Sequence, residues 1–204
     1  MRIPILFEMT NKTVIAVGGG AVAAKKLKHF IGVGADITII APSLHPALQQ
    51  LYENGQIQWQ KREVREEEQF DSLLLLLMTE KKELNQSLYE KKLPHQLVYV
   101  ANDAQKSDIH FPATLQKGPL TMALSTDGAS PAYTKQLKNR LAEQLPADIE
   151  GDLYFLKQAR KIILADPSLA EQKKQLLQQI STEEFLRQEN RDQLLEAMLE
   201  DARQ

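Results

Sequence analysis

The chain has no cysteine among its 204 residues. Disulfides, thiolate nucleophiles, iron–sulfur clusters and cysteine-based zinc sites are therefore excluded. The lack of cysteine suits a reducing compartment, and we expect the protein in the cytoplasm. No apolar run approaches the length of a membrane span, so we expect no membrane association, and the apolar N-terminal stretch is too short for a signal peptide.

The sequence also lacks an excess of either charge and any obvious set of metal ligands. Its formal net charge is -2 and its isoelectric point is about 6.1, so we expect no general nucleic-acid binding. None of the 4 histidines is paired with another at metal-ligand spacing, and no metal site is predicted. With 43% hydrophobic and 25% charged residues, the composition is that of an ordinary globular protein.

A glycine-rich turn between a strand and a helix is the most informative stretch. The strand-like segment Thr13–Val17 precedes it, and Gly18, Gly20 and Ala23 fit the G-x-G-x-x-G/A template in the required context. Gly18 allows a tight turn, and Gly20 lets the backbone approach a pyrophosphate at the helix N-terminus. We predict dinucleotide binding, with a turn that binds no nucleotide as the alternative. The predicted cofactor-binding residues are Gly18, Gly19, Gly20, Ala21 and Val22.

Strands and helices alternate through the first hundred residues. Strands are predicted at Ile3–Met9, Thr13–Val17, Asp36–Ile40, Ile57–Gln60, Leu73–Met78 and Leu97–Ala101. Helices are predicted from Ala21 to about Gly32, at Leu44–Glu53 and at Glu80–Lys92. This alternation predicts an α/β fold with a parallel, doubly wound, Rossmann-type sheet.

The pattern changes after Asn102. Ile109–Gln116 and Leu120–Thr126 are strand-like runs joined by Lys117-Gly118-Pro119, which favours an antiparallel hairpin. Ser130-Pro131 then begins a helix that runs to about Leu145. The remaining helices are predicted at Ile149–Ala165, up to Ile180, and from a capping box at Ser181–Glu184 to Ala202. We therefore predict three domains, a Rossmann domain at 1–110, a small α+β domain at 111–147 and a helical domain at 148–204.

The end of the second strand carries no acidic residue for a cofactor ribose. Segment 39–43 reads Ile-Ile-Ala-Pro-Ser, so Ser43 or the backbone would bind the ribose hydroxyls. No arginine stands there for a 2′-phosphate, which favours NAD over NADP. Thr79, at the end of the fourth strand, lies where such sheets bind ligands, although a simple turn threonine is an equal alternative.

Asn102 and Asp103 follow the fifth strand and are predicted to face the same crevice. A carboxylate there would accept a proton while a hydride leaves for a nicotinamide. The alternative is an Asx-rich turn that caps the next element, and the residue types alone favour it. His110 lies near the expected crevice, although a lone histidine is more often structural.

Two groups of polar residues in the later part of the chain suit an anionic substrate. The loop hydroxyls of Ser125 and Thr126 are able to bind carboxylates or phosphates, and no neighbouring His or Lys supports nucleophilic catalysis. Lys135 and Lys138 share a helix face at a spacing of three, with Arg140 nearby. They form a basic patch suited to a polyanion, or else an ordinary solvated helix face.

Several motifs in this order resemble the precorrin-2 dehydrogenase family of siroheme biosynthesis, over roughly residues 3–145. They are Val17-Gly-Gly-Gly-Ala-Val-Ala-Ala-Lys-Lys26, Gly34-Ala-Asp-Ile-Thr-Ile-Ile-Ala-Pro42, Phe111-Pro-Ala113, Gly118-Pro-Leu120 and Leu124-Ser-Thr-Asp-Gly-Ala-Ser-Pro131. The resemblance implies NAD-dependent oxidation of precorrin-2 to sirohydrochlorin. It also implies a homodimer, in which the 111–147 domain dimerises and binds a substrate with eight carboxylates.

The resemblance also implies where the catalytic aspartate would be. Counting back from Phe111-Pro112 places Asn102 at the position of the family's aspartate, with Asp103 one step on. Asn cannot act as a base, so either Asp103 takes the role by a one-residue shift or hydride loss needs little help from a base, with His110 as a substitute acceptor. The alternatives are an enzyme that also inserts Fe²⁺ or Co²⁺ into sirohydrochlorin, and a non-catalytic NAD- or tetrapyrrole-binding sensor.

Overall fold

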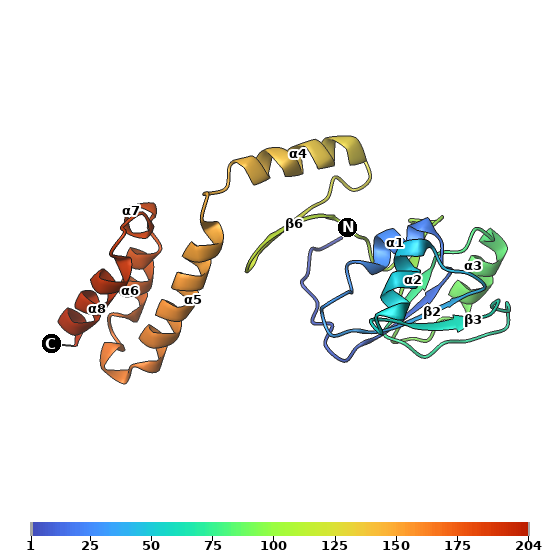
Figure 1. Ribbon diagram of the computed structural model, residues 1–204, viewed down its shortest axis with the longest axis horizontal. Coiled ribbons are helices and arrows are strands. Elements are labelled where there is room, and N and C mark those ends of the chain that lie inside the picture. Colours follow the sequence, from blue (N-terminus) through green and yellow to red (C-terminus); the bar gives the residue numbers. More distant parts are fainter. Residues whose placement is uncertain (1, 204) are drawn as a thin grey trace. The chain divides into compact units, whose positions relative to one another are not determined.

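The computed structural model describes residues 2–203, and the chain divides into two compact units between Phe111 and Pro112. In Figure 1 the first unit runs from blue to green and the second from green to red. Within the described residues, no helix has both the length and the apolar character needed to cross a membrane.

The first unit is built on a parallel sheet, as the alternation of strands and helices predicted. Its strands are β1 (Thr13–Val17), β2 (Asp36–Ala41), β3 (Gln58–Lys61), β4 (Leu74–Leu77) and β5 (Leu97–Val100). They lie in the order β3-β2-β1-β4-β5, and each neighbouring pair is parallel. The strand order reverses direction between β1 and β4, which defines a topological switch point.

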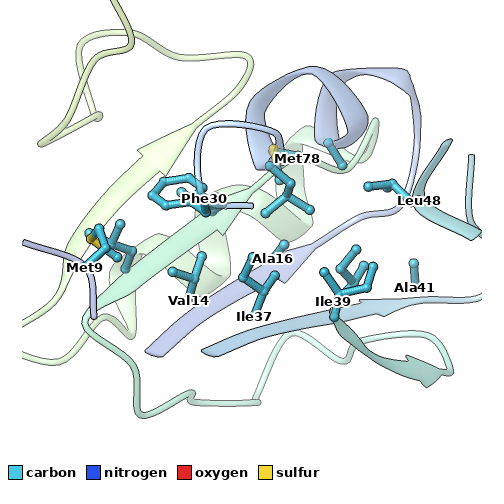
Figure 2. Close-up of a cluster of buried hydrophobic side chains, with 14 residues drawn as sticks. Met9, Val14, Ala16, Phe30, Ile37, Ile39, Ala41, Leu48 and Met78 are labelled. Atoms are coloured by element: carbon cyan, nitrogen blue, oxygen red, sulfur yellow. The ribbon is translucent and has the colours of Figure 1, made fainter. Parts of the chain in front are cut away.

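Helices cover both faces of this sheet. They are α1 (Ala21–Leu27), α2 (Pro46–Glu53) and α3 (Lys82–Glu90). Successive strand residues point to opposite faces, and alternate residues of β4 accordingly belong to different hydrophobic clusters. Leu48 of α2 packs with β1 and β2 on one face (Figure 2). Leu27 of α1 belongs to the same cluster, whereas Leu84 and Leu88 of α3 pack on the other face.

Two local expectations for the first unit were wrong. Residues 3–9 form neither a strand nor a helix, and the side chains of Ile3, Ile5 and Leu6 are exposed by 66–84%. The reason is topological, because both edges of β1 are already occupied by β2 and β4, and Pro4 has no N–H to donate. Helix α1 is also shorter than predicted, because the chain turns after Leu27 and reaches two left-handed glycines at 32 and 34.

The second unit begins with the predicted antiparallel hairpin. Strands β6 (Ala113–Lys117) and β7 (Leu120–Leu124) pair in register, with Lys117 opposite Leu120. Gly118 takes a φ of +51°, as the first central residue of a two-residue hairpin turn requires. Helix α4 (Pro131–Glu143) follows, and the Ser130 hydroxyl caps it by accepting the Tyr133 N–H at 3.2 Å.

Helices form the remainder of the second unit. They are α5 (Ile149–Ala165), the 3₁₀ turn η1 (Pro167–Leu169), α6 (Lys173–Ile180), α7 (Glu183–Leu186) and α8 (Arg191–Ala202). Their apolar side chains, including buried Ile163, Leu169 and Ile180, form a core of their own.

The predicted last helix is interrupted. Thr182, rather than Ser181, is the N-cap and accepts the Phe185 N–H at 3.3 Å, but the helix it starts is the short α7. The chain leaves the helix at Arg187 and restarts with α8 at Arg191, whose guanidinium contacts the Asp152 carboxylate of α5 at 2.6 Å. Packing of Arg191 against α5 replaces the continuous helix that local propensity favours.

Candidate active site

A cavity of about 630 Å³ opens at the carboxyl ends of β1, β2 and β4. This is the switch point at which open parallel sheets bind ligands, and its volume lies within the roughly 300–1,000 Å³ common for ligand sites. All the residues that the sequence indicated for cofactor binding line it. They are Gly18, Gly19, Gly20, Ala21, Val22, Ser43 and Thr79.

The three glycines of the loop differ in what they contact. Gly18 has a φ of +110°, and a Cβ there would lie 2.6 Å from the Met78 carbonyl oxygen. A Cβ on Gly19 would lie 2.4 Å from the Ser43 carbonyl oxygen. At Gly20 a Cβ would meet nothing within 4 Å, because this residue faces open space. The loop therefore packs tightly beneath Gly18 and Gly19 and leaves room above Gly20 for a ligand.

Backbone hydrogen bonds fix the loop at the edge of the sheet. The Gly18 N–H donates to Ile40 O at 3.0 Å, and the His45 N–H donates to Gly19 O at 2.7 Å. The first helical bond of α1 runs from the Ala24 N–H to Gly20 O at 3.0 Å. The preceding N–H groups have no intrahelical acceptor, and together with the helix dipole they suit an anion. The loop and cavity thus fit a dinucleotide pyrophosphate.

Thr79 is held by a buried asparagine that sequence reasoning did not single out. The Asn85 side chain is fully buried. Its Oδ1 lies 2.7 Å from the Thr79 hydroxyl and its Nδ2 donates to Thr79 O at 2.9 Å. Nδ2 also lies 3.5 Å from Asn102 Oδ1. Asn85 therefore ties together the chain segments that leave β4 and β5.

Asn102 and Asp103 line a second, smaller pocket and not the glycine-loop cavity. This pocket measures about 330 Å³ and lies beside α3. The Asp103 Oδ1 accepts the N–H groups of Gln105 at 3.0 Å and Lys106 at 3.3 Å, and its Oδ2 lies 3.5 Å from Lys106 Nζ. Asp103 therefore makes the Asx-type turn that the residue types favoured, and its other oxygen is paired with a cation.

Charged residues that the sequence analysis did not single out also line the glycine-loop cavity. Arg62 and Glu63 come from the segment after β3, and Lys81 precedes α3. Only the strand order reveals Arg62, because Lys61 pairs with Ala41 and the next residue therefore lies beside the end of β2.

The predicted substrate residues of the second unit lie in the loop before α4 and on α4 itself. The Ser125 hydroxyl accepts the Asp127 N–H at 3.2 Å, and the Thr126 hydroxyl lies 2.8 Å from that of Thr134. These hydroxyls thus order their own loop. On α4, Lys135 is exposed and Lys138 half-buried, and neither forms an ion pair with another residue in 2–203.

His110 is half-buried and lines neither of the two cavities described above. A different histidine, His29, stacks its ring on that of Phe111, the residue after His110, with the ring centroids 5.4 Å apart. Burial, and then the charges of Lys28 and Lys26, lower the pKa of His29. No group of three or more His, Asp or Glu residues within 2–203 is placed to hold a metal ion.

A parallel, doubly wound sheet with a glycine loop at its switch point defines the class of NAD(P)-binding Rossmann-type domains. Comparison with known proteins agrees with this class and also identifies the family. Residues 5–113 match a family described as putative NAD(P)-binding, and residues 117–144 match the sirohaem biosynthesis protein central family. The chain belongs to the precorrin-2 dehydrogenase family, which includes the corresponding part of siroheme synthases.

The relatives cover between 72% and 98% of this chain. The chain is 30% identical to precorrin-2 dehydrogenase of Bacillus subtilis, over 78% of this chain and 98% of that protein. It is 35% identical to siroheme synthase of Zymomonas mobilis, over 72% of this chain but 31% of that longer protein. A solved structure of SirC, a precorrin-2 dehydrogenase, superimposes with a TM-score of 0.84 at 26% identity, covering 98% of this chain and 100% of that one.

Proposed function

We propose that the chain oxidises precorrin-2 to sirohydrochlorin, with NAD as the hydride acceptor. One hydride leaves the macrocycle for the nicotinamide and one proton leaves for a base, so that NAD⁺ becomes NADH. The observation that carries this proposal is the glycine-loop cavity at the switch point, in a chain that spans 98% of the Bacillus subtilis precorrin-2 dehydrogenase. Bound NAD would supply the oxidant, while the protein would position the cofactor and the substrate and supply charged groups.

The glycine loop is proposed to hold the cofactor pyrophosphate. The N–H groups at the start of α1, including those of Ala21 and Val22, lie beside open space above Gly20. Ser43, at the end of β2, is proposed to bond the ribose hydroxyls, because no carboxylate stands there. Thr79 closes the opposite side of the cavity, at the end of β4.

Asp103 is proposed to handle the proton that accompanies hydride loss. It is a carboxylate, whereas the adjacent Asn102 is an amide that cannot act as a base. Asp103 Oδ2 is free of backbone donors among residues 2–203 and lies 3.5 Å from Lys106 Nζ. We assign Asn102 a positioning role, through its contact with Asn85, and His110 the role of a substitute proton acceptor.

The carboxylates of the substrate are proposed to bind the second unit. Ser125 and Thr126 would contact them from the loop before α4, and Lys135 and Lys138 would supply positive charge from one helix face. The absence of nearby ion-pair partners for both lysines within residues 2–203 supports this assignment, because their charges are not already neutralised.

The activity test is an anaerobic incubation of the protein with precorrin-2 and NAD. We expect sirohydrochlorin absorbance and NADH fluorescence to rise together at a rate proportional to protein concentration. The proposal is wrong if neither signal exceeds that of a protein-free control. The residue assignment is tested by Asp103→Asn against Asn102→Ala, and an Asp103→Asn rate equal to that of the unsubstituted protein would remove Asp103 from the mechanism.

The protein is further proposed to act as a homodimer in the cytoplasm. Support for the dimer comes from the family resemblance and from the hairpin β6–β7, whose two strands pair with no further strand from residues 2–203. The lack of cysteine supports a reducing compartment. Light scattering coupled to size-exclusion chromatography is expected to give twice the chain mass of 23.1 kDa, and a monomer mass would contradict the assembly.

A further inference from the structure

Arg62 lies at the part of the cavity where the adenosine ribose of a dinucleotide is expected. Strand β3 ends at Lys61, which pairs with Ala41 at the end of β2. The next residue, Arg62, therefore lies beside Pro42, and it lines the same cavity as Ser43. In dinucleotide-binding folds, the residues at the end of the second strand meet the ribose 2′ position, and an arginine nearby accommodates a 2′-phosphate.

The charge of Arg62 is already neutralised by a carboxylate. Its Nη1 lies 2.9 Å from Glu68 Oε1 and 2.8 Å from Glu68 Oε2, and it also donates to Glu63 O at 3.2 Å. Its Nε donates to the Gln60 side chain at 3.1 Å. The side chains of Arg62 and Glu68 are exposed by 41% and 25%, so the pair is partly shielded from water.

Glu68 is held in place independently of Arg62. One carboxylate oxygen accepts the Arg65 N–H at 2.7 Å, and the Glu68 N–H returns a bond to Arg65 O at 3.3 Å. Burial alone would raise the pKa of Glu68, but the Arg65 N–H and the Arg62 guanidinium outweigh it and lower the pKa. The carboxylate is therefore charged at neutral pH and fixed by the backbone, next to the guanidinium it neutralises.

We propose that Glu68 sets the cofactor preference of the cavity by neutralising Arg62, so that the site takes the 2′-hydroxyl of NAD and rejects the 2′-phosphate of NADP. This inference rests on the proposed dinucleotide site. Glu68 is a positioning residue, because it acts through the guanidinium of Arg62. A 2′-phosphate would have to compete with the Glu68 carboxylate for Arg62.

The test compares the affinities of the whole protein for NAD and NADP by titration calorimetry. Glu68→Gln removes the charge but keeps an oxygen for the Arg65 N–H. We expect this variant to bind NADP about tenfold or more tightly than the unsubstituted protein, because a charge-assisted bond to the phosphate becomes available. Its affinity for NAD should change by less than about threefold. The ratio of the two affinities is the decisive quantity, because general loosening of the loop would weaken both cofactors.

Glu67→Gln is the matched control, because it makes the same charge change one residue away at an exposed position with no ion pair among residues 2–203. The double variant Glu68→Gln with Arg62→Ala should lose the gain in NADP affinity. An equal effect of Glu68→Gln and Glu67→Gln on NADP binding would overturn the inference, as would equal affinities of the unsubstituted protein for the two cofactors. Failure of both cofactors to bind the unsubstituted protein would instead overturn the proposed function.

Discussion

At the scale of single residues, three identical glycines perform different tasks. Gly18 needs a left-handed backbone, Gly19 needs to pack against the β2–α2 loop, and Gly20 leaves open space. The motif spacing predicted the outer two roles, but it did not distinguish a glycine required for folding from a glycine required for ligand approach. Alanine substitutions at Gly18 and Gly20 separate these requirements, because an added methyl group meets strain and close contact at Gly18 but open space at Gly20.

Gly18→Ala is expected to destabilise the fold by about 2–4 kcal/mol, because φ is +110° and the new Cβ would lie 2.6 Å from Met78 O. Gly20→Ala is expected to change the free energy of unfolding by less than about 1 kcal/mol, because nothing lies within 4 Å. It should nevertheless weaken NAD binding, because the methyl group enters the cavity. Urea denaturation and calorimetry measure the two effects, and equal stability losses would contradict this distinction.

The stability of the protein should depend on the protonation of His29. Its pKa in the folded protein is lowered from 6.5, first by burial and then by Lys28 and Lys26. On acidification, the unfolded chain therefore binds a proton before the folded state does. The stabilisation contributed by neutral His29 is complete above about pH 6.5 and is lost as pH falls through the lower folded pKa.

Urea midpoints measured between about pH 8 and pH 5 test this linkage. His29→Phe keeps an aromatic ring for the stack on Phe111 but cannot bind a proton. We expect the variant to lose less stability than the unsubstituted protein over the same pH interval. An unchanged pH dependence would show that other groups cause the acid destabilisation.

At the scale of secondary-structure elements, β4, α3 and β5 are joined by a polar contact inside an otherwise apolar layer. Leu84 and Leu88 of α3 pack on the sheet, as their spacing suggests. Between them lies Asn85, which an apolar helix face would not predict and which bonds to Thr79 at the end of β4. The contact therefore positions the rim of the cavity.

Asn85→Ala is expected to cost about 1–3 kcal/mol, because it removes the hydrogen bonds between a fully buried amide and half-buried Thr79, whose hydroxyl keeps only its bond to Lys81 O. It should also weaken NAD binding, because Thr79 lines the cavity. Ser87→Ala, a half-buried position on the same helix, is the control and should cost about 0.5 kcal/mol or less. Equal losses for the two variants, measured by urea denaturation, would refute the role of Asn85.

At the scale of the whole molecule, the two units have separate hydrophobic cores. The core around Ile163, Leu169 and Ile180 belongs to the helices after residue 148, whereas every residue lining the glycine-loop cavity lies between 17 and 84. Damage to the helical core should therefore affect stability without changing the cofactor site directly.

Two adjacent isoleucines of α5 provide this test. Ile163 is fully buried, and Ile162 is 48% exposed. Ile163→Ala should destabilise the helical core by about 2–5 kcal/mol, and Ile162→Ala by no more than about 1 kcal/mol. Under conditions where both variants remain folded, NAD affinity measured by calorimetry should match that of the unsubstituted protein. A loss of NAD affinity in Ile163→Ala alone would show that the cavity depends on the helical core.

The regular elements were largely predictable because their signals are local. The helix at Ile149–Ala165 and the strand at Thr13–Val17 have the predicted bounds, since hydrophobic spacing and capping residues act over a few positions. Residues 3–9 were not predictable in the same way, because a strand-like sequence forms a strand only beside a partner. The prediction of one continuous last helix was wrong for a related reason, since the contact from Arg191 to Asp152 spans 39 residues of sequence.

The sequence by itself determined the class of fold, the position of the glycine loop and the family, because short motifs carry these properties through backbone conformation. Only the tertiary structure decided what surrounds the loop. Parallel pairing of β2 with β3 brings Arg62, with Glu68 bound to it, beside the end of β2, and Asn85 reaches Thr79 through the fold. Charge and polarity at the cavity are therefore set by residues distant in sequence, since strand order, and not spacing along the chain, brings them together.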